Sequence, residues 1–298
     1  NSYVWDWALG SGGFLISAMN IMLSDAQERL KNSPEEYRKK EYEIKHEQLL
    51  GIELLPDIYM LAVLNMILMG DGSSNIVNEN SLTEYQGNYA YQDKKFEANV
   101  FLLNPPYSAE GNGLIFVQKA FEKMKSGKGA VIIQDSAGSG RATEICKAIL
   151  KNNRLIGSIR MPADLFKASV QTSIYVFEVG KKHKKDDQVK FIDFSDDGYA
   201  RTNRKKAISN LKDTGTANLR YKEIVRIVRG QEVNPKFYIL GENYFVDCIN
   251  PQAGNDWNVN QHKKIDTTPT FDDFRNTVAN HLAWEVDTIM KSGDFLGK

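Results

Sequence analysis

The sequence has few of the features that mark disulfide-rich, metal-clustered or membrane proteins. Its 298 residues include 2 cysteines, Cys146 and Cys248, which are far apart and have no CxxC partner. This spacing argues against a disulfide framework or a zinc cluster. No apolar run reaches the roughly 18 residues that a membrane-spanning helix needs, and no secretory signal pattern is present. These absences predict a reducing, cytoplasmic location and no membrane partner.

The sequence also lacks histidines at the spacing of metal ligands, and its charged residues balance to zero net charge. The histidines His46, His183, His262 and His281 are too dispersed to suggest a metal site, and Lys+Arg and Asp+Glu number 38 each. The charge is unevenly distributed, however. Residues 181–229 contain 14 Lys or Arg against 7 Asp or Glu, whereas residues 240–298 contain 5 against 9. A locally basic stretch suits a phosphate backbone, and a solvated surface segment is the equally good alternative.

Short β-rich runs alternate with helical patterns through the first two thirds of the chain. The strand-like runs are residues 3–5, 50–53, 99–102, 130–133, 155–159, 173–177 and 189–194. Helical patterns cover residues 14–31, 34–48, 56–69, 114–125 and 141–151. This alternation predicts βαβ units and an α/β fold with a mainly parallel sheet. Polar, poorly periodic sequence follows to about residue 219, and a last helix is expected over residues 271–290.

A glycine-rich turn follows the first expected strand, in the sequence "VWDWALGSGGFLISAM". Gly10, Gly12 and Gly13 lie where this strand gives way to a helix, with Asp6 just before them. Glycines let a backbone approach a ligand closely, and a helix N-terminus offers free N–H groups. No Gly-Lys-Ser/Thr follows, so the turn is not a phosphate-binding P-loop.

A carboxylate and a polar motif follow two further strands. Glu53 lies at the end of the second strand, where an open α/β sheet binds ribose hydroxyls; a helix-start carboxylate is the alternative. The apolar run 100–103 leads directly into Asn104-Pro105-Pro106-Tyr107. Taken alone, this motif is explained by a stiffened β-turn. Together with the glycine turn and Glu53, it predicts a nucleoside cofactor across the carboxyl ends of the strands.

These motifs resemble those of a known enzyme family. The pattern Asp-x-Ala-x-Gly-x-Gly-Gly-Phe at 6–14, Glu53 and the Asn-Pro-Pro-Tyr motif are similar to the motifs of S-adenosylmethionine-dependent DNA amino-methyltransferases. The stretch "GAVIIQDSAGSGRATEICKAILKNNRLIGSIRMPADLFKASVQTSIYVFE" resembles more narrowly the modification subunit of type I restriction–modification systems. The resemblance covers roughly residues 3 to 195.

The resemblance implies a Rossmann-like sheet of seven strands with helices on both faces, and S-adenosyl-L-methionine as cofactor. It implies methyl transfer to the N6 amine of adenine in double-stranded DNA, with a specificity subunit and also a restriction subunit as partners. Residues 1–195 would form the catalytic domain, and residues 196–298 a mixed or helical extension for subunit or DNA contacts. The cofactor-binding residues it implies are Asp6, Ala8, Gly10, Gly12, Gly13, Phe14, Glu53 and Asn80.

The Asn-Pro-Pro-Tyr motif suits amine methylation chemically. An exocyclic amine is a poor nucleophile, because its lone pair is delocalised into the ring. The side-chain carbonyl of Asn104 and the backbone carbonyl of Pro105 would accept its hydrogens and stabilise the developing positive charge. Pro105 and Pro106 fix φ and remove a competing N–H. Tyr107 offers an aromatic face to a base rotated out of the duplex.

Three positions depart from the family pattern, which has Pro and Cys at Trp7 and Leu9, and an acid at Asn80. The bulk of Trp7 is expected to alter cofactor affinity, and Asn80 would accept through an uncharged carbonyl. The resemblance also places a helical domain before residue 1, so weak cofactor binding by these residues alone is expected. Two other functions stay open: methylation of a protein glutamine or an RNA base, and a catalytically silent scaffold. Adenine is favoured over cytosine by the resemblance alone.

Overall fold

Most of the described chain is organised around one twisted sheet. The computed structural model describes residues 1–70, 75–90, 92–166, 170–201, 211–231, 234–263 and 271–292, and it divides into the units Asn1–Lys263 and Lys264–Lys298. The sheet has nine strands in the order β11-β8-β6-β7-β5-β4-β1-β2-β3. These strands are β1 Val4–Asp6, β2 Leu49–Ile52, β3 Ile76–Val77, β4 Val100–Leu103, β5 Gly127–Gln134, β6 Arg154–Arg160, β7 Thr172–Val179, β8 Gln188–Asp193 and β11 Tyr244–Cys248.

Parallel pairing dominates the half of the sheet that carries the sequence motifs. β3, β2, β1, β4 and β5 are mutually parallel, whereas β7 runs antiparallel between β5 and β6, and β11 runs antiparallel to β8. The carboxyl ends of β1, β2 and β4 therefore meet at one edge. The expected α/β sheet is confirmed, but the expected count of seven strands is too low, because β8 and β11 extend the sheet beyond β6.

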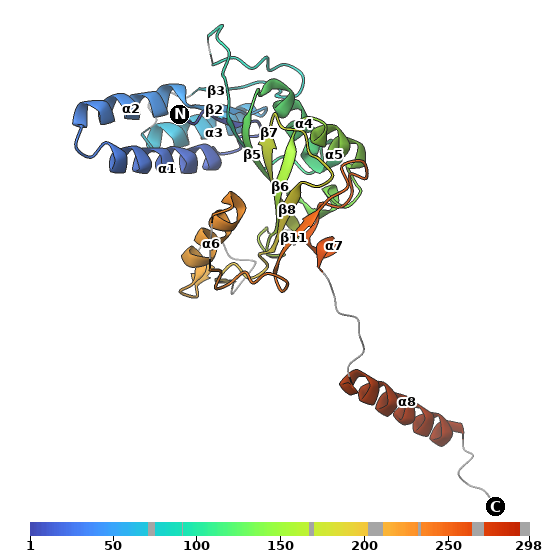
Figure 1. Cartoon of the computed structure of the whole chain (residues 1–298). Coiled ribbons are helices and arrows are strands. Elements are labelled where there is room, and N and C mark those ends of the chain that lie inside the picture. The colour runs from blue at the N-terminus through green and yellow to red at the C-terminus, as the bar shows by residue number, and fades with distance from the viewer. Residues whose placement is uncertain are drawn as a thin grey trace, which may run out of the picture. The chain divides into compact units, whose positions relative to one another are not determined.

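Helices cover both faces of the sheet. Figure 1 shows α1, α2 and α3 grouped on one side, and α4 and α5 on the other. Their bounds are α1 Gly13–Arg29, α2 Pro34–Glu47, α3 Pro56–Leu68, α4 Leu114–Lys123 and α5 Thr143–Leu150, with 3-10 turns η1 Glu110–Gly113 and η2 Asp135–Ala137. All five α-helices confirm the sequence patterns to within a few residues.

The strands are buried on both faces, as expected where helices cover a parallel sheet. In β1, Val4 packs with Leu15 and Met19 of α1, while its neighbour Trp5 packs into the core beneath α4. Successive strand side chains point to opposite faces, so one apolar run supplies both cores. This explains why the strands read as continuous apolar segments.

Residues 196–201, 211–231 and 234–263 continue the first unit after β8. The hairpin β9 Tyr199–Arg201 and β10 Leu211–Asp213 leads to α6 Ala217–Arg229, and α7 Val259–His262 follows β11. Ile224 and Ile227 of α6 pack on Ile159 of β6 and Ile192 of β8. The expectation of poorly periodic sequence to about residue 219 missed this hairpin. The division into a catalytic domain and an extension at residue 195 stays a prediction about function.

The second unit contains α8 Phe271–Ser292, which confirms the expected last helix. Phe271, Phe274 and Leu282 recur at helical spacing and are exposed. No helix in the described ranges has the length and apolarity needed to span a membrane.

The outer face of α3 is also apolar and exposed. The opposite face packs Ala62 and Met66 into the core. On the outside, more than half of the Leu64 side chain and 80% of the Leu68 side chain are exposed, and the patch extends to Leu54 and Leu55 at the start of the helix. A helix that is apolar all round normally lies buried on every side.

Candidate functional site

The turn between β1 and α1 holds a tightly folded backbone. Gly10 and Gly12 have φ values of 57° and 87°, a left-handed region that costs residues with a Cβ atom conformational energy. The Leu9 N–H donates to the Ile52 carbonyl over 3.0 Å, and Asn65 of α3 donates from Nδ2 to the Ser11 carbonyl over 2.9 Å. The glycines therefore let the turn fold back against the end of β2.

Glu53 joins this turn to the end of β2. Its Oε2 accepts from the Gly10 N–H and its Oε1 from the Leu55 N–H, each over 2.9 Å. Each oxygen keeps a second lone pair for an incoming donor. The carboxylate is thus fixed in place beside the glycine turn while it can still accept from a ligand.

Asp6 lies beneath the turn, only 1% exposed. The Ala8 N–H donates to its Oδ1 over 3.1 Å, and its Oδ2 has no hydrogen-bond partner among the described residues. Burial raises the pKa of Asp6 to about 7; the Ala8 N–H opposes this rise and the nearby Glu53 carboxylate adds to it. Asp6 is therefore an acid with an unsatisfied buried oxygen that titrates near neutral pH.

The two unusual residues of the turn fit their surroundings. The Leu9 side chain lies over Gly51 so closely that a Cβ at residue 51 would be 2.7 Å from both Leu9 Cδ atoms. Trp7 is buried and packs edge-to-face against Trp5, at 5.2 Å between ring centroids, and against Tyr85 at 5.8 Å. Both departures from the resembled pattern are accommodated by the core without opening the turn.

Asn80 follows β3 and caps a turn. Its Oδ1 accepts from the N–H of Leu82 over 2.9 Å and of Thr83 over 3.3 Å. The adjacent Ser81 donates its hydroxyl to the Trp7 carbonyl over 2.9 Å. The acceptor capacity expected of Asn80 is therefore already used by the backbone, and its Nδ2 donors are what it retains for a ligand.

The Asn-Pro-Pro-Tyr loop (residues 104–107) begins where β4 ends. Asn104 and Pro106 are exposed, whereas Pro105 is buried. Tyr107 is half-buried; its ring packs edge-to-face on Phe166 at 6.3 Å between centroids. Its hydroxyl lies inside the protein without a partner in the described ranges, and burial raises the pKa of Tyr107 to about 12. The phenol is neutral at physiological pH.

One cavity of about 440 Å³ brings the separate motifs together. Of the residues predicted from sequence, its walls contain Ala8, Gly10, Glu53, Asn80, Asn104 and Pro106. The other predicted residues lie nearby in the sequence but do not line the cavity; they are Asp6, Gly12, Gly13, Phe14, Pro105 and Tyr107. The remaining wall residues are Trp7, Leu54, Leu55, Ser81, Leu82, Ala109 and Phe116.

Apart from Trp7, these additional wall residues could not be identified from the sequence. In the sequence pattern, Leu54 and Leu55 are typical of residues before a helix, and Phe116 is typical of an apolar residue within α4. They become wall residues through tertiary packing alone. Their apolar character, beside a few fixed polar groups, is typical of small-molecule sites.

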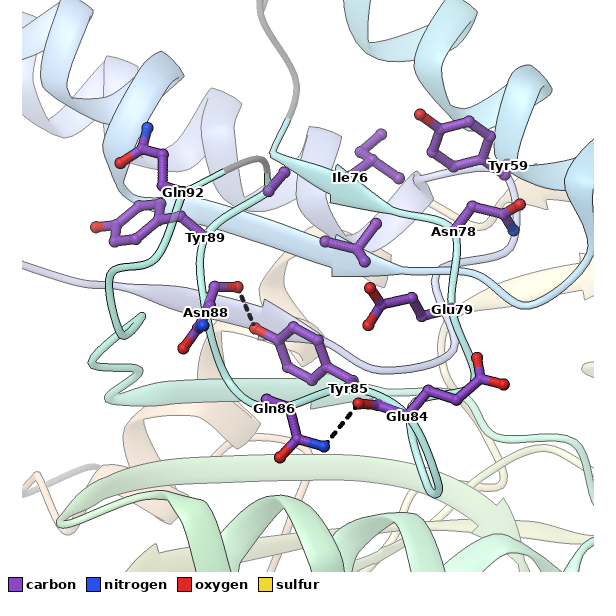
Figure 2. A pocket seen from close by; sticks show the side chains of 12 residues that line it. Tyr59, Ile76, Asn78, Glu79, Glu84, Tyr85, Gln86, Asn88, Tyr89 and Gln92 are labelled. Carbon is purple, nitrogen blue, oxygen red and sulfur yellow. Dashed lines mark hydrogen bonds between the residues drawn. The ribbon is translucent and has the colours of Figure 1, made fainter.

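A second cavity of about 430 Å³ adjoins β3. Figure 2 shows Tyr59 and Asn78 near one end of it and Tyr89 and Gln92 near the other, with Tyr85 between them. It contains no residue of the glycine turn or the Asn-Pro-Pro-Tyr loop, so the chemistry predicted from sequence belongs to the first cavity. Within the described residues, no three His, Cys, Asp or Glu side chains are grouped closely enough to hold a metal ion.

Comparisons with known proteins show which sequences and folds the chain resembles. The N-6 DNA Methylase family model matches residues 1–114 and 110–273. The type II restriction enzyme and methyltransferase RM.BcgI of Heyndrickxia coagulans is 31% identical over 308 residues, covering 99% of this chain and 45% of that protein. This chain thus spans about half the length of that relative.

Solved modification subunits have a similar fold. The M protein of the type I restriction enzyme EcoKI is 23% identical, with a TM-score of 0.57 over 74% of this chain and 49% of that one. The type I methyltransferase subunit from Streptococcus thermophilus is 18% identical, with a TM-score of 0.60 over 88% of this chain and 54% of that one. At these identities the likeness concerns the fold, and it confirms the Rossmann-like architecture expected from the sequence.

Proposed function

Because the chain belongs to the N-6 DNA methylase family, we propose that it transfers a methyl group from S-adenosyl-L-methionine to the N6 amine of an adenine in DNA. The observation that carries the proposal is the shared cavity, whose walls include Gly10 and Glu53 as well as Asn104. A cofactor site and an amine-binding loop in one cavity are what methyl transfer between two bound molecules requires.

The residues around the glycine turn fit this cofactor. A cavity of about 440 Å³ lies within the range of roughly 300–1,000 Å³ usual for small-molecule sites. The fixed Glu53 carboxylate suits ribose hydroxyls. The Oδ2 of Asp6 has no hydrogen-bond partner among the described residues, and a cationic ligand group above the turn would favour the ionised form of this carboxyl. When bound, S-adenosyl-L-methionine supplies a methyl group on a sulfonium centre.

The Asn-Pro-Pro-Tyr loop would act on the acceptor amine. The exposed Asn104 side chain and the Pro105 carbonyl would accept the two amine hydrogens and stabilise positive charge on the nitrogen. Tyr107 would stack on an adenine rotated out of the duplex. Base stacking on an aromatic ring is worth on the order of 1–3 kcal/mol, which offsets part of the cost of unpairing.

One surface of α6 suits the phosphate backbone of double-stranded DNA. Lys222, Arg226 and Arg229 are exposed and line a groove of about 310 Å³ together with Tyr221. Elsewhere in the stretch 181–229, Arg201 pairs with Asp197, whereas Lys182, Lys184 and Lys185 are exposed after β7. Residues 202–210 of that stretch lie outside the described residues. Among the described residues, the basic character expected from sequence is thus shared between α6 and the exposed lysines of residues 181–185.

We further propose that the chain works in a restriction–modification complex, with DNA sequence recognition supplied by a specificity subunit and with a restriction subunit as a further partner. The fold shared with the EcoKI M protein supports this proposal. Residues 1–195 would provide the catalytic domain and residues 196–298 the subunit and DNA contacts. This proposed assembly implies that the chain works in the cytoplasm.

The test is methyl incorporation by the full-length assembled complex. Asn104→Ala should abolish transfer of labelled methyl groups to duplex DNA, because it removes one of two acceptors. The matched control is Asn152→Ala, which shortens an exposed asparagine two residues after the end of α5. Nucleoside mass spectrometry should identify N6-methyladenine in the product.

Other outcomes would contradict the proposal in distinguishable ways. Equal methylation by Asn104→Ala and wild type would leave the loop without a catalytic role. Methylation of a release factor or ribosomal RNA in place of DNA would show a different acceptor, and N4-methylcytosine a different base. Cofactor binding without any methyl transfer would indicate a silent scaffold.

A further inference from the structure

We infer that the left-handed run Gly111-Asn112-Gly113 positions the Asn-Pro-Pro-Tyr loop, holding Pro105 in place from behind. The inference rests on the proposed function for its catalytic consequence, but the packing can be tested independently. These three residues are positioning residues, since none of them lines the cavity that holds Asn104.

The backbone of this run is unusual over three consecutive residues. Gly111, Asn112 and Gly113 have φ values of 60°, 56° and 98°, and Asn112 is the sole non-glycine residue with a positive φ in the described part of the chain. A residue with a Cβ atom is disfavoured in this region. Such conformations persist where the surroundings impose them, and they are concentrated at functional sites.

Asn112 is tied to the strand next to the loop. Its side chain is 7% exposed, and its Nδ2 donates to Ser136 Oγ over 2.8 Å. Ser136 lies in η2, directly after β5, and β5 pairs with β4, which leads into Asn104. The hydrogen bond therefore fixes the left-handed run to the carboxyl edge of the sheet.

The two glycines are in close contact on both sides. A Cβ at Gly113 would lie 2.6 Å from Cβ and Cγ of Pro105 and 3.3 Å from the Pro106 carbonyl oxygen, and one at Gly111 would lie 2.7 Å from Cδ1 of Ile145 in α5. The run is thus packed between α5 and the proline ring. A proline ring cannot rotate away, so any added atom at Gly113 must displace Pro105 itself.

This contact determines where the Pro105 carbonyl lies. In the proposed reaction that carbonyl accepts one hydrogen of the amine, and misplacing a catalytic group by roughly 1 Å can cost on the order of 100-fold in rate. The run therefore contributes to the rate of transfer without touching cofactor or base.

Gly113→Ala in the assembled full-length complex tests the inference, with Gly241→Ala as the matched control. Gly241 has a φ of 91°, and a Cβ there meets no described atom within 4 Å. Both variants carry similar backbone strain, but only Gly113→Ala displaces Pro105. We expect kcat to fall at least ~10-fold in Gly113→Ala alone, with the cofactor Kd within about 2-fold of wild type.

The Asn112–Ser136 bond provides a second test that adds no bulk. Asn112→Gly preserves the left-handed backbone, and Ser136→Ala preserves Asn112, but each substitution removes the hydrogen bond. Both single variants should therefore have a lower kcat, and the double variant should be no slower than either of them. Asn112→Asp can accept from the Ser136 hydroxyl and should restore much of the rate. Additive losses, or no recovery in Asn112→Asp, would overturn the role of this bond.

A spectroscopic readout separates this inference from the proposed function. With 3-fluorotyrosine at Tyr107, Gly113→Ala should shift the ¹⁹F resonance and Gly241→Ala should not. If wild type fails to methylate DNA, the proposed function fails, and the ¹⁹F comparison still decides the packing role. Identical resonances in the two variants, or wild-type kcat in Gly113→Ala, would show that the run does not position the loop.

Discussion

Replacing the buried Asp6 with asparagine should make the chain more stable at neutral and alkaline pH. Burial raises the pKa of this carboxyl from its ordinary 3.8 to about 7. Asn keeps an oxygen that can accept from the Ala8 N–H, but it carries no proton to lose. Asp6→Asn therefore removes the pH-dependent cost of burying an ionised carboxylate, and the Nδ2 that takes the place of Oδ2 adds only a cost that does not vary with pH.

The magnitude follows from the two pKa values. Folded protein retains a proton that the unfolded chain releases between about pH 4 and pH 7, so wild-type stability falls as pH rises through this window and levels off above it. Each pKa unit corresponds to about 1.4 kcal/mol, so Asp6 costs the folded state roughly 4 kcal/mol above pH 8 and roughly 1.5 kcal/mol at pH 5.

Urea denaturation of both proteins at several pH values between 5 and 8.5 measures this difference. The free energy of unfolding of Asp6→Asn minus that of wild type should grow by about 2–3 kcal/mol from pH 5 to pH 8 and then stay constant. Other titrating groups cancel in the subtraction. A difference that does not vary with pH would mean that Asp6 is not buried as an unsatisfied acid, and the account of the glycine turn would be wrong.

Three further outcomes are expected. Gly51→Ala should lose about 1–3 kcal/mol of unfolding free energy through its clash with Leu9, and Leu9→Ala in the same chain should restore part of it in urea denaturation. Charge reversal of Lys222 or Arg226 should weaken DNA binding by the assembled complex. It should also reduce the steepness of log K for DNA association against log salt concentration by about 1 per lost phosphate contact. Charge reversal of the exposed Lys39 on α2 should have neither effect. Calorimetric titration of residues 1–298 alone should show weak S-adenosyl-L-methionine binding, and tight binding would contradict this expectation. If a cationic group of the ligand lies against Asp6, binding near pH 6 should release protons. Equal heats in buffers of different ionisation enthalpy would show that no protons are released.

The sequence predicted those parts of the site that depend on residues close together in the chain. Gly10 and Gly12 are glycines because of their positive φ, and Glu53 follows directly on a strand. Such features depend on neighbours in the chain, and the parallel sheet then brings them to one edge without further information.

The parts that sequence missed depend on tertiary packing. α6 is amphipathic, but Ile224 and Ile227 lie in a segment rich in charged residues, which obscure the apolar pattern; these are Arg220, Lys222, Glu223, Arg226 and Arg229. β11 joins the sheet only because β8 offers a free edge. Likewise, nothing near Leu9 in the sequence indicates that Gly51 leaves room for it, and nothing near Asn80 indicates that backbone N–H groups occupy its carbonyl.

The apolar outer surface of α3 has a practical consequence for experiments on these 298 residues. Leu54 and Leu55 belong both to that surface and to the wall of the cavity. A detergent or another copy of the chain that adhered there at high concentration would alter the wall of the cavity. By thermodynamic linkage, ligand affinity measured for these residues will depend on protein concentration and additives, so titrations should be repeated across a dilution series.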